Sequence, residues 1–188
     1  MDNRDELIQQ LQETVRLLTL ENDQLAERAE DTLLLGLLGE KINTTSQEDQ
    51  VLEIALEQIA LLKDFPIGIC CMLEPDQVLV KKSFLSFSQE QWDGRSIASS
   101  PQLLDALAHG PSLVEPGACQ EMGLDGLFDP AALDLTPVLL IPFWLQDEKA
   151  GFFLFVGPGV EGWMDNSLPL LERAVEMVVM RIDNLSLL

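Results

Sequence analysis

A helical stripe of apolar side chains near the N-terminus constrains this chain more than any other feature. Its members alternate at spacings of three and four residues from residue 7 to about residue 35, which is the heptad pattern of a coiled coil. A helix with such a stripe buries it against a partner, so we expect residues 1–36 to form a coiled-coil or signalling helix. The stripe consists of Ile8, Leu11, Val15, Leu18, Asn22, Leu25, Ala29 and Thr32.

The residues within this seam predict the partner of the helix. Leu11, Leu18 and Leu25 fall on one line of the seam, and Asn22 falls on the other. Leucines with one buried asparagine favour a parallel two-stranded coil, in which the paired asparagines fix the register. We therefore expect a homodimer with these four residues in its interface. The alternative is that this side of the helix packs on the chain's own folded domain.

A second helical stripe occupies the C-terminal segment, after a helix start predicted at Asp165 or Asn166. It steps by four, three, four and three residues, and its later members are expected to extend the dimer interface. The helix reaches Leu188 without a Gly, Pro or polar cap, so we expect it to continue into a C-terminal output domain. A native terminus packed against the core is the alternative. The stripe comprises Leu171, Val175, Val178, Ile182 and Leu185.

Between the two stripes the sequence alternates between helix and strand patterns. A capping box from Thr45 to Glu48 predicts the start of a second helix, which ends before Pro66. Short apolar runs bounded by turn residues predict strands at 67–73, 78–87, 138–144 and 151–156, arranged as two antiparallel hairpins. Ser100 followed by Pro101 predicts a short helix. A brief strand at 111–114 and an irregular segment at 115–136 complete the pattern.

The net charge argues against several classes of partner, and the cysteine content argues against a secreted protein. The chain has 32 acidic and 11 basic residues, a formal net charge of −21, which repels phosphate backbones and anionic membrane surfaces. We therefore expect no nucleic acid partner and no membrane contact. No apolar run is long enough to span a bilayer, the first residues are too polar for a signal peptide, and three cysteines do not form a secreted disulfide framework. These features predict a cytoplasmic chain with reduced thiols.

The order of these elements resembles that of a GAF domain over about residues 37–188. The most specific segment is Thr136 to Trp144 followed by Lys149 to Val156, which is similar to the family's apolar strand ending in Pro and a large residue, a polar turn, and a Gly that opens the last strand. The stretch Leu104 to Val114 is similar to its short helix, Gly and third strand. The resemblance implies an α+β fold, with helices on one face of a central antiparallel sheet and a ligand pocket under residues 88–136.

The resemblance also implies a non-catalytic sensory domain of a signalling protein, such as a histidine kinase of a two-component system or a diguanylate cyclase. It would bind an unidentified small ligand or partner and relay the signal through dimeric helices. The alternative is a dimerisation module whose pocket is filled by side chains. Ligand-pocket candidates are Trp92, Arg95, Cys119 and Phe128. Trp144 is a further aromatic residue, and we expect it in the core.

No cofactor can be assigned from the sequence. Bilin-binding relatives carry a cysteine beside a histidine, and no such pair occurs here. We expect His109 to cap a helix, since one histidine does not make a histidine-based metal site. Cys70 and Cys71 point to opposite faces of a strand and are expected to pack as small hydrophobes, whereas Cys119 is expected to be exposed in a loop, where it could sense oxidants. The prediction includes no metal site and no catalytic residue.

Overall fold

The computed structural model describes residues 3–128, 137–157 and 167–187. The chain divides into two compact units, Met1–Leu37 and Leu38–Leu188. Within the described ranges, no helix is long and apolar enough to cross a membrane. The elements are α1 (Asn3–Asn43), α2 (Glu48–Leu62), β1 (Ile67–Leu73), β2 (Gln77–Leu85), β3 (Ser96–Ala98), α3 (Pro101–Ala108), β4 (Ser112–Val114), α4 (Pro116–Met122), η1 (Leu124–Leu127), β5 (Val138–Trp144), β6 (Ala150–Val156) and α7 (Leu168–Ser186).

The second unit is built on a six-stranded sheet in the order β3-β2-β1-β6-β5-β4. Every neighbouring pair in this sheet is antiparallel. The predicted hairpins are present as β1–β2 and β5–β6, and β1 and β6 join them at the centre of the sheet. The predicted α+β class with a central antiparallel sheet is therefore confirmed.

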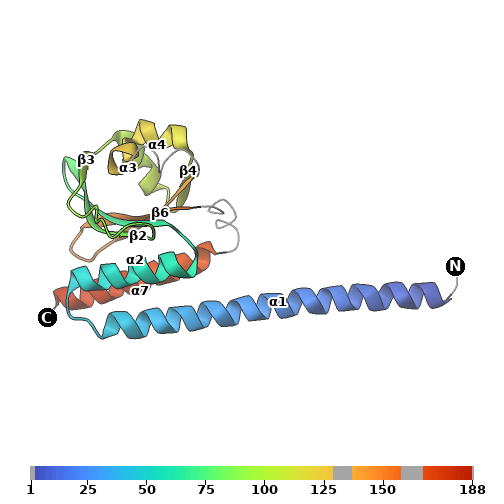
Figure 1. The fold of residues 1–188 in the computed structure, drawn as a ribbon. Helices are drawn as coiled ribbons and strands as arrows, with labels where there is room; N and C mark the ends of the chain where they lie inside the picture. The colour runs from blue at the N-terminus through green and yellow to red at the C-terminus, as the bar shows by residue number, and fades with distance from the viewer. Residues whose placement is uncertain (1–2, 129–136, 158–166, 188) are drawn as a thin grey trace. The chain divides into compact units, whose positions relative to one another are not determined.

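Helices cover both faces of this sheet. Figure 1 shows α2 and α7 side by side on one face, with α3 and α4 on the other. Side chains alternate between the faces along each strand, so Cys71 joins the cluster under α3 and α4, while Phe153 and Phe155 stack on the opposite face. Because both faces are buried, the central strands are apolar at nearly every position, as the run at 67–73 indicated.

Helix α1 runs without interruption from Asn3 to Asn43, which confirms the long N-terminal helix. Its seam residues are exposed in the single chain: Leu11 is 57% exposed, Leu18 59% and Leu25 62%. Solvent-exposed leucines in such a row contribute nothing to stability until another surface covers them. The end of α1 lies in the second unit, where Leu38 and Ile42 are buried.

Helix α7 packs along the second unit through the stripe that the sequence predicted. Val178 and Ile182 are almost fully buried by the chain itself, and Leu185 is half-buried. Their burial needs no partner chain, so the dimer role of these three residues stays a prediction. The helix starts at Leu168, and the predicted cap at Asp165 or Asn166 lies outside the described residues.

Two local predictions were wrong. Helix α2 has Gln47 as its N-cap without a side-chain hydrogen bond, and the Thr45 hydroxyl instead donates to Gln50 Oε1 at 2.5 Å. The described part of the segment predicted to be irregular forms helix α4 and the short helix η1. Gly123, with a φ of 77°, ends α4 in a left-handed cap. The glycines of this segment had suggested irregular structure, but this one marks the end of a helix.

Candidate functional site

Three of the four predicted pocket residues meet on the face of the sheet covered by α3 and α4. The Trp92 ring lies edge-on to Phe128, with 6.0 Å between ring centroids. The Arg95 guanidinium lies over the Trp92 ring at 4.7 Å from its centroid, and Nη1 donates to the Leu127 carbonyl at 3.4 Å. Residues far apart in the sequence therefore form one aromatic and cationic cluster.

The segment between β2 and β3 holds this cluster by folding back on β2. The Val80 N–H donates to the Arg95 carbonyl at 2.8 Å, and the Gly94 N–H donates to the Val80 carbonyl at 2.9 Å. The Ser83 hydroxyl oxygen accepts a bond from the Trp92 N–H at 2.8 Å. These bonds fix the backbone of Trp92 and Arg95 from both sides, so the indole ring is directed into the core.

Cys119, the fourth candidate, is fully buried, and the prediction of an exposed loop cysteine was wrong. Helix α4 begins at Pro116 and turns Cys119 inward, toward the same cluster that contains Trp92 and Phe128. Burial, with a smaller effect of the nearby carboxylates of Asp125 and Glu115, raises the pKa of the Cys119 thiol to about 11. A thiol with this pKa is protonated at neutral pH and is a poor redox sensor.

The thiols should be unreactive in the folded chain. Burial raises the pKa of Cys70 and Cys71 as well, so thiolate is scarce at all three positions. We expect 5,5′-dithiobis(2-nitrobenzoate) to modify none of the three at mildly alkaline pH, and all three after unfolding in guanidinium chloride. Rapid modification of Cys119 in the native chain would contradict its burial and restore the redox interpretation.

Side chains fill the region where the family resemblance implied a pocket. Trp92 is 1% exposed and Phe128 is 4% exposed, and both contribute to a continuous apolar cluster with residues of β1, β5 and β6. One polar atom is left over, since Trp92 Nε1 is buried and has no hydrogen-bond partner among the described residues. Residues 129–136 of the predicted roof lie outside the described residues.

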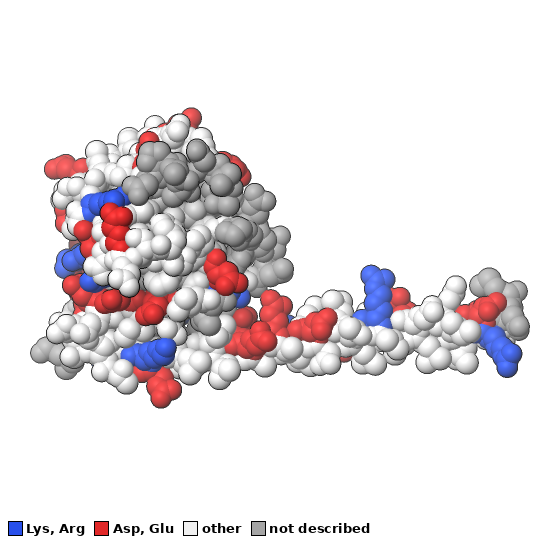
Figure 2. Space-filling view, viewed as in Figure 1, with Lys and Arg blue, Asp and Glu red and all other residues white. Residues whose placement is uncertain are grey.

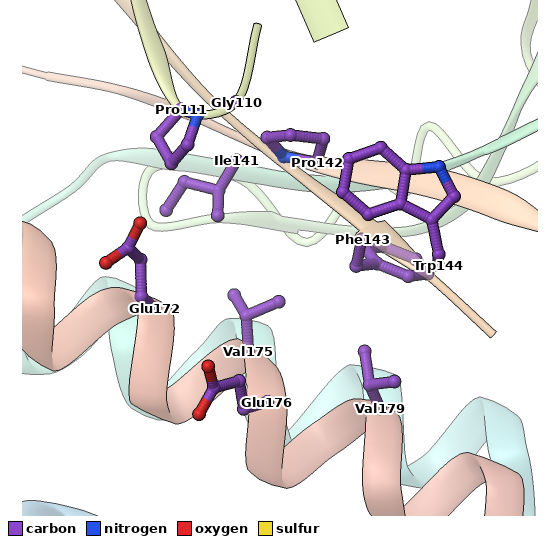
Figure 3. Close-up of a pocket in the computed structure, with 10 residues that line it drawn as sticks. All are labelled: Gly110, Pro111, Ile141, Pro142, Phe143, Trp144, Glu172, Val175, Glu176 and Val179. Atoms are coloured by element: carbon purple, nitrogen blue, oxygen red, sulfur yellow. The ribbon is translucent and has the colours of Figure 1, made fainter. Parts of the chain in front are cut away.

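A groove lies on the other side of β5, beside α7. Figure 3 shows Val175 and Val179 pointing from α7 toward β5, with Glu172 and Glu176 on the same helix. The groove has a volume of about 320 Å³, and its remaining lining residues are Gly110, Pro111, Ile141, Pro142, Phe143 and Trp144. This groove was not predicted from the sequence.

Trp144 belongs to the groove, and its expected place in the core was wrong. Its side chain is 58% exposed because it is the last residue of β5, directly before the hairpin turn. It also lies beyond the pairing with β4, which reaches only to Leu140 opposite Ser112. His109 is exposed at the C-cap of α3, where its Nδ1 lies 2.7 Å from the Asp105 carbonyl oxygen. In the described ranges, no three His, Cys, Asp or Glu side chains lie together as metal ligands.

Solved structures with the same arrangement of elements are GAF domains. The chain is similar to the phycoerythrobilin-bound GAF domain from a cyanobacterial phytochrome, with a TM-score of 0.65 and 12% identity over 85% of this chain and 98% of that one. It is also similar to residues 122 to 287 of a methyl-accepting chemotaxis protein, with a TM-score of 0.58 and 12% identity over 82% of this chain and 99% of that one.

The GAF domain of an Acinetobacter phosphoenolpyruvate-protein phosphotransferase is a further match, with a TM-score of 0.52 and 13% identity over 77% of this chain and 90% of that one. No protein-family model and no curated protein matches the sequence. The chain therefore has the fold of a GAF domain, as the sequence resemblance implied.

Proposed function

We propose that this chain is a non-catalytic sensory or regulatory domain of a cytoplasmic signal-transduction protein. It responds to a small ligand or partner and relays the response through paired helices to an output domain in the same polypeptide. The GAF fold supports this proposal, because similar folds occur in a phytochrome and in a chemotaxis protein. Fold alone does not define a function, so the proposal depends on features of the chain itself.

The continuity of α1 is the observation that carries this proposal. The helix that presents the exposed leucine seam is the same helix whose end is buried in the second unit, through Leu38, Gly39 and Ile42. Gly39 lies so close to α7 that an added Cβ would come 2.7 Å from Met177 Cε. A change in the packing of α7 would therefore act on the end of α1 directly, and α1 would carry it to the paired seam.

A second candidate function is supported by the filled face of the sheet. Trp92, Phe128 and Cys119 occupy the volume that a ligand would need there, which favours a dimerisation module without a ligand. Both functions require the homodimer, and they differ in one respect only. The sensor requires in addition that a bound molecule shifts the balance between two packings of the helices.

Light scattering of the purified chain tests the element common to both. We expect a molar mass of twice the 20.9 kDa of the chain at micromolar concentration. A monomer at that concentration would remove helix pairing, and with it both proposed functions. A dimer with no binding of any small molecule in native mass spectrometry would favour the dimerisation module over the sensor.

A further inference from the structure

The groove beside α7 has the size and lining of a small-molecule site. Its volume of about 320 Å³ lies at the lower end of the range for such sites, roughly 300–1,000 Å³. Its lining is mostly apolar: Ile141 and Phe143 from β5 and Val175 from α7 are almost fully buried and form its floor, and the half-buried Val179 lies beside them. A ligand held here would lay an apolar body over the line where β5 packs on α7.

Two carboxylates set the charge that the groove prefers. Glu172 and Glu176 are one helical turn apart on α7, both exposed, and both line the groove. Within the described part of the chain, neither forms an ion pair. Figure 2 shows that acidic side chains also outnumber basic ones on the visible surface, consistent with the net charge of −21. The field of the whole chain therefore attracts cations to this site.

The edge of β5 adds a hydrogen-bond acceptor. The Leu145 N–H donates to the Lys149 carbonyl at 2.8 Å, so these two residues form a hydrogen-bonded pair of the β5–β6 ladder. Hydrogen-bonded pairs alternate along an antiparallel ladder, so the backbone groups of Ile141 and Phe143 point toward β6, whereas the Pro142 carbonyl points toward the outer edge of β5. The register of β4 and β5 would place Gly110 opposite Pro142, but the Gly110 N–H donates to the Leu107 carbonyl instead. The Pro142 carbonyl is left without a ladder donor at the groove.

From these features we propose that the groove binds a small organic cation, with an apolar body lying over Phe143 and Val179 and an ammonium group held by Glu172 and Glu176. The Pro142 carbonyl accepts a bond from the ammonium. The proposal rests on the proposed function, because it names the class of ligand that the sensor detects. It also assigns recognition to the α7 side of the sheet.

The position of the groove connects binding to the helices. Glu172, Val175, Glu176 and Val179 belong to α7, and the neighbouring Met177 contacts the buried end of α1 at Gly39. A ligand that spreads or tightens the contact between β5 and α7 therefore shifts the helix against which α1 packs. Binding would therefore take place on the same helix that contacts the end of α1.

Three molecules with one carbon skeleton and different charges test the proposal: 3-phenylpropylammonium, 3-phenylpropan-1-ol and 3-phenylpropionate. Calorimetry on the full chain should show the cation binding about tenfold more tightly than the alcohol, with no binding of the carboxylate. Chemical shift changes in two-dimensional NMR spectra should map to β5 and α7. Equal binding of the cation and the alcohol, or shifts confined to the Trp92 cluster, would overturn the proposal.

Charge-removing variants isolate the carboxylates. Glu172→Gln and Glu176→Gln should each weaken binding of the cation about threefold, and the double variant about tenfold, without changing the weak binding of the alcohol. Glu57→Gln, an exposed glutamate on α2 outside the groove, is the matched control and should leave binding unchanged. If the chain is dimeric by light scattering but the cation is not selected, this proposal fails while the proposed function stands; if the chain is monomeric, the proposed function fails first.

Discussion

Replacing Leu18 by glutamate is expected to convert the chain from a dimer into a monomer. Leu18 lies on the leucine line of the α1 seam and is 59% exposed in the single chain, so a partner helix would bury it in two copies per dimer. Each buried leucine contributes about 1.5–3 kcal/mol, and the loss of two costs about 3–6 kcal/mol. This raises the dissociation constant by a factor of about 10² to 10⁴.

Leu17→Glu is a closely matched control. Leu17 is the preceding residue, carries the same side chain and is 53% exposed, but it lies off the seam. Light scattering at micromolar concentration should give the dimer mass for Leu17→Glu and the monomer mass for Leu18→Glu. Circular dichroism should also show less helix for Leu18→Glu, because an unpaired helix has little support in water. Dimers for both variants would show that the helices do not pair through this seam.

Periodicity was sufficient to predict the elements that dominate the fold. The run from Val138 to Trp144 is bounded by turn residues and too short for a helix, and it is β5 with those bounds. The α1 and α7 helices follow from stripes that repeat over several turns, so a single misread residue would not have changed them. Strong, repeated local patterns survive folding because the tertiary packing uses the same faces that the sequence marks.

The candidate site was less predictable, because it depends on where elements end and on how they pack. Trp92, Arg95 and Phe128 were chosen one at a time from the sequence, and the fold brought them together. Cys119 was placed in a loop because neighbouring glycines hid the helix α4. The groove could not be foreseen, since it exists only where β4 stops short of Pro142 and α7 crosses beneath β5.

The structure gives Gly151 a different role from the one the sequence suggested. The sequence resemblance implied a glycine that opens the last strand. In the structure Gly151 pairs with Met72 on one side and Phe143 on the other, and it is absent from the glycines with positive φ among the described residues. An added Cβ would overlap the Cys71 carbonyl oxygen and lie 2.6 Å from Phe143 Cζ. The glycine therefore provides room between three strands.

Gly151→Ala is accordingly expected to be one of the most damaging single substitutions in the second unit. The Cys71 oxygen belongs to the backbone of the central strand β1 and cannot move without breaking its ladder with β6, so the overlap is relieved only by shifting strands. Overpacking of this kind costs about 3 kcal/mol. For a chain of this length that lowers the Tm by about 6–12 °C.

Thermal and urea unfolding at one fixed protein concentration measure this effect without interference from dimer dissociation. Gly117→Ala supplies the control, because Gly117 lies in the first turn of α4, has no positive φ, and has no atom within 4 Å of the added Cβ. Alanine there should leave stability unchanged or raise it by up to about 1 kcal/mol, since it restricts the unfolded chain. If Gly151→Ala proved as stable as Gly117→Ala, the close approach of β1, β5 and β6 at Gly151 would be wrong, and with it the register that leaves the Pro142 carbonyl free at the groove.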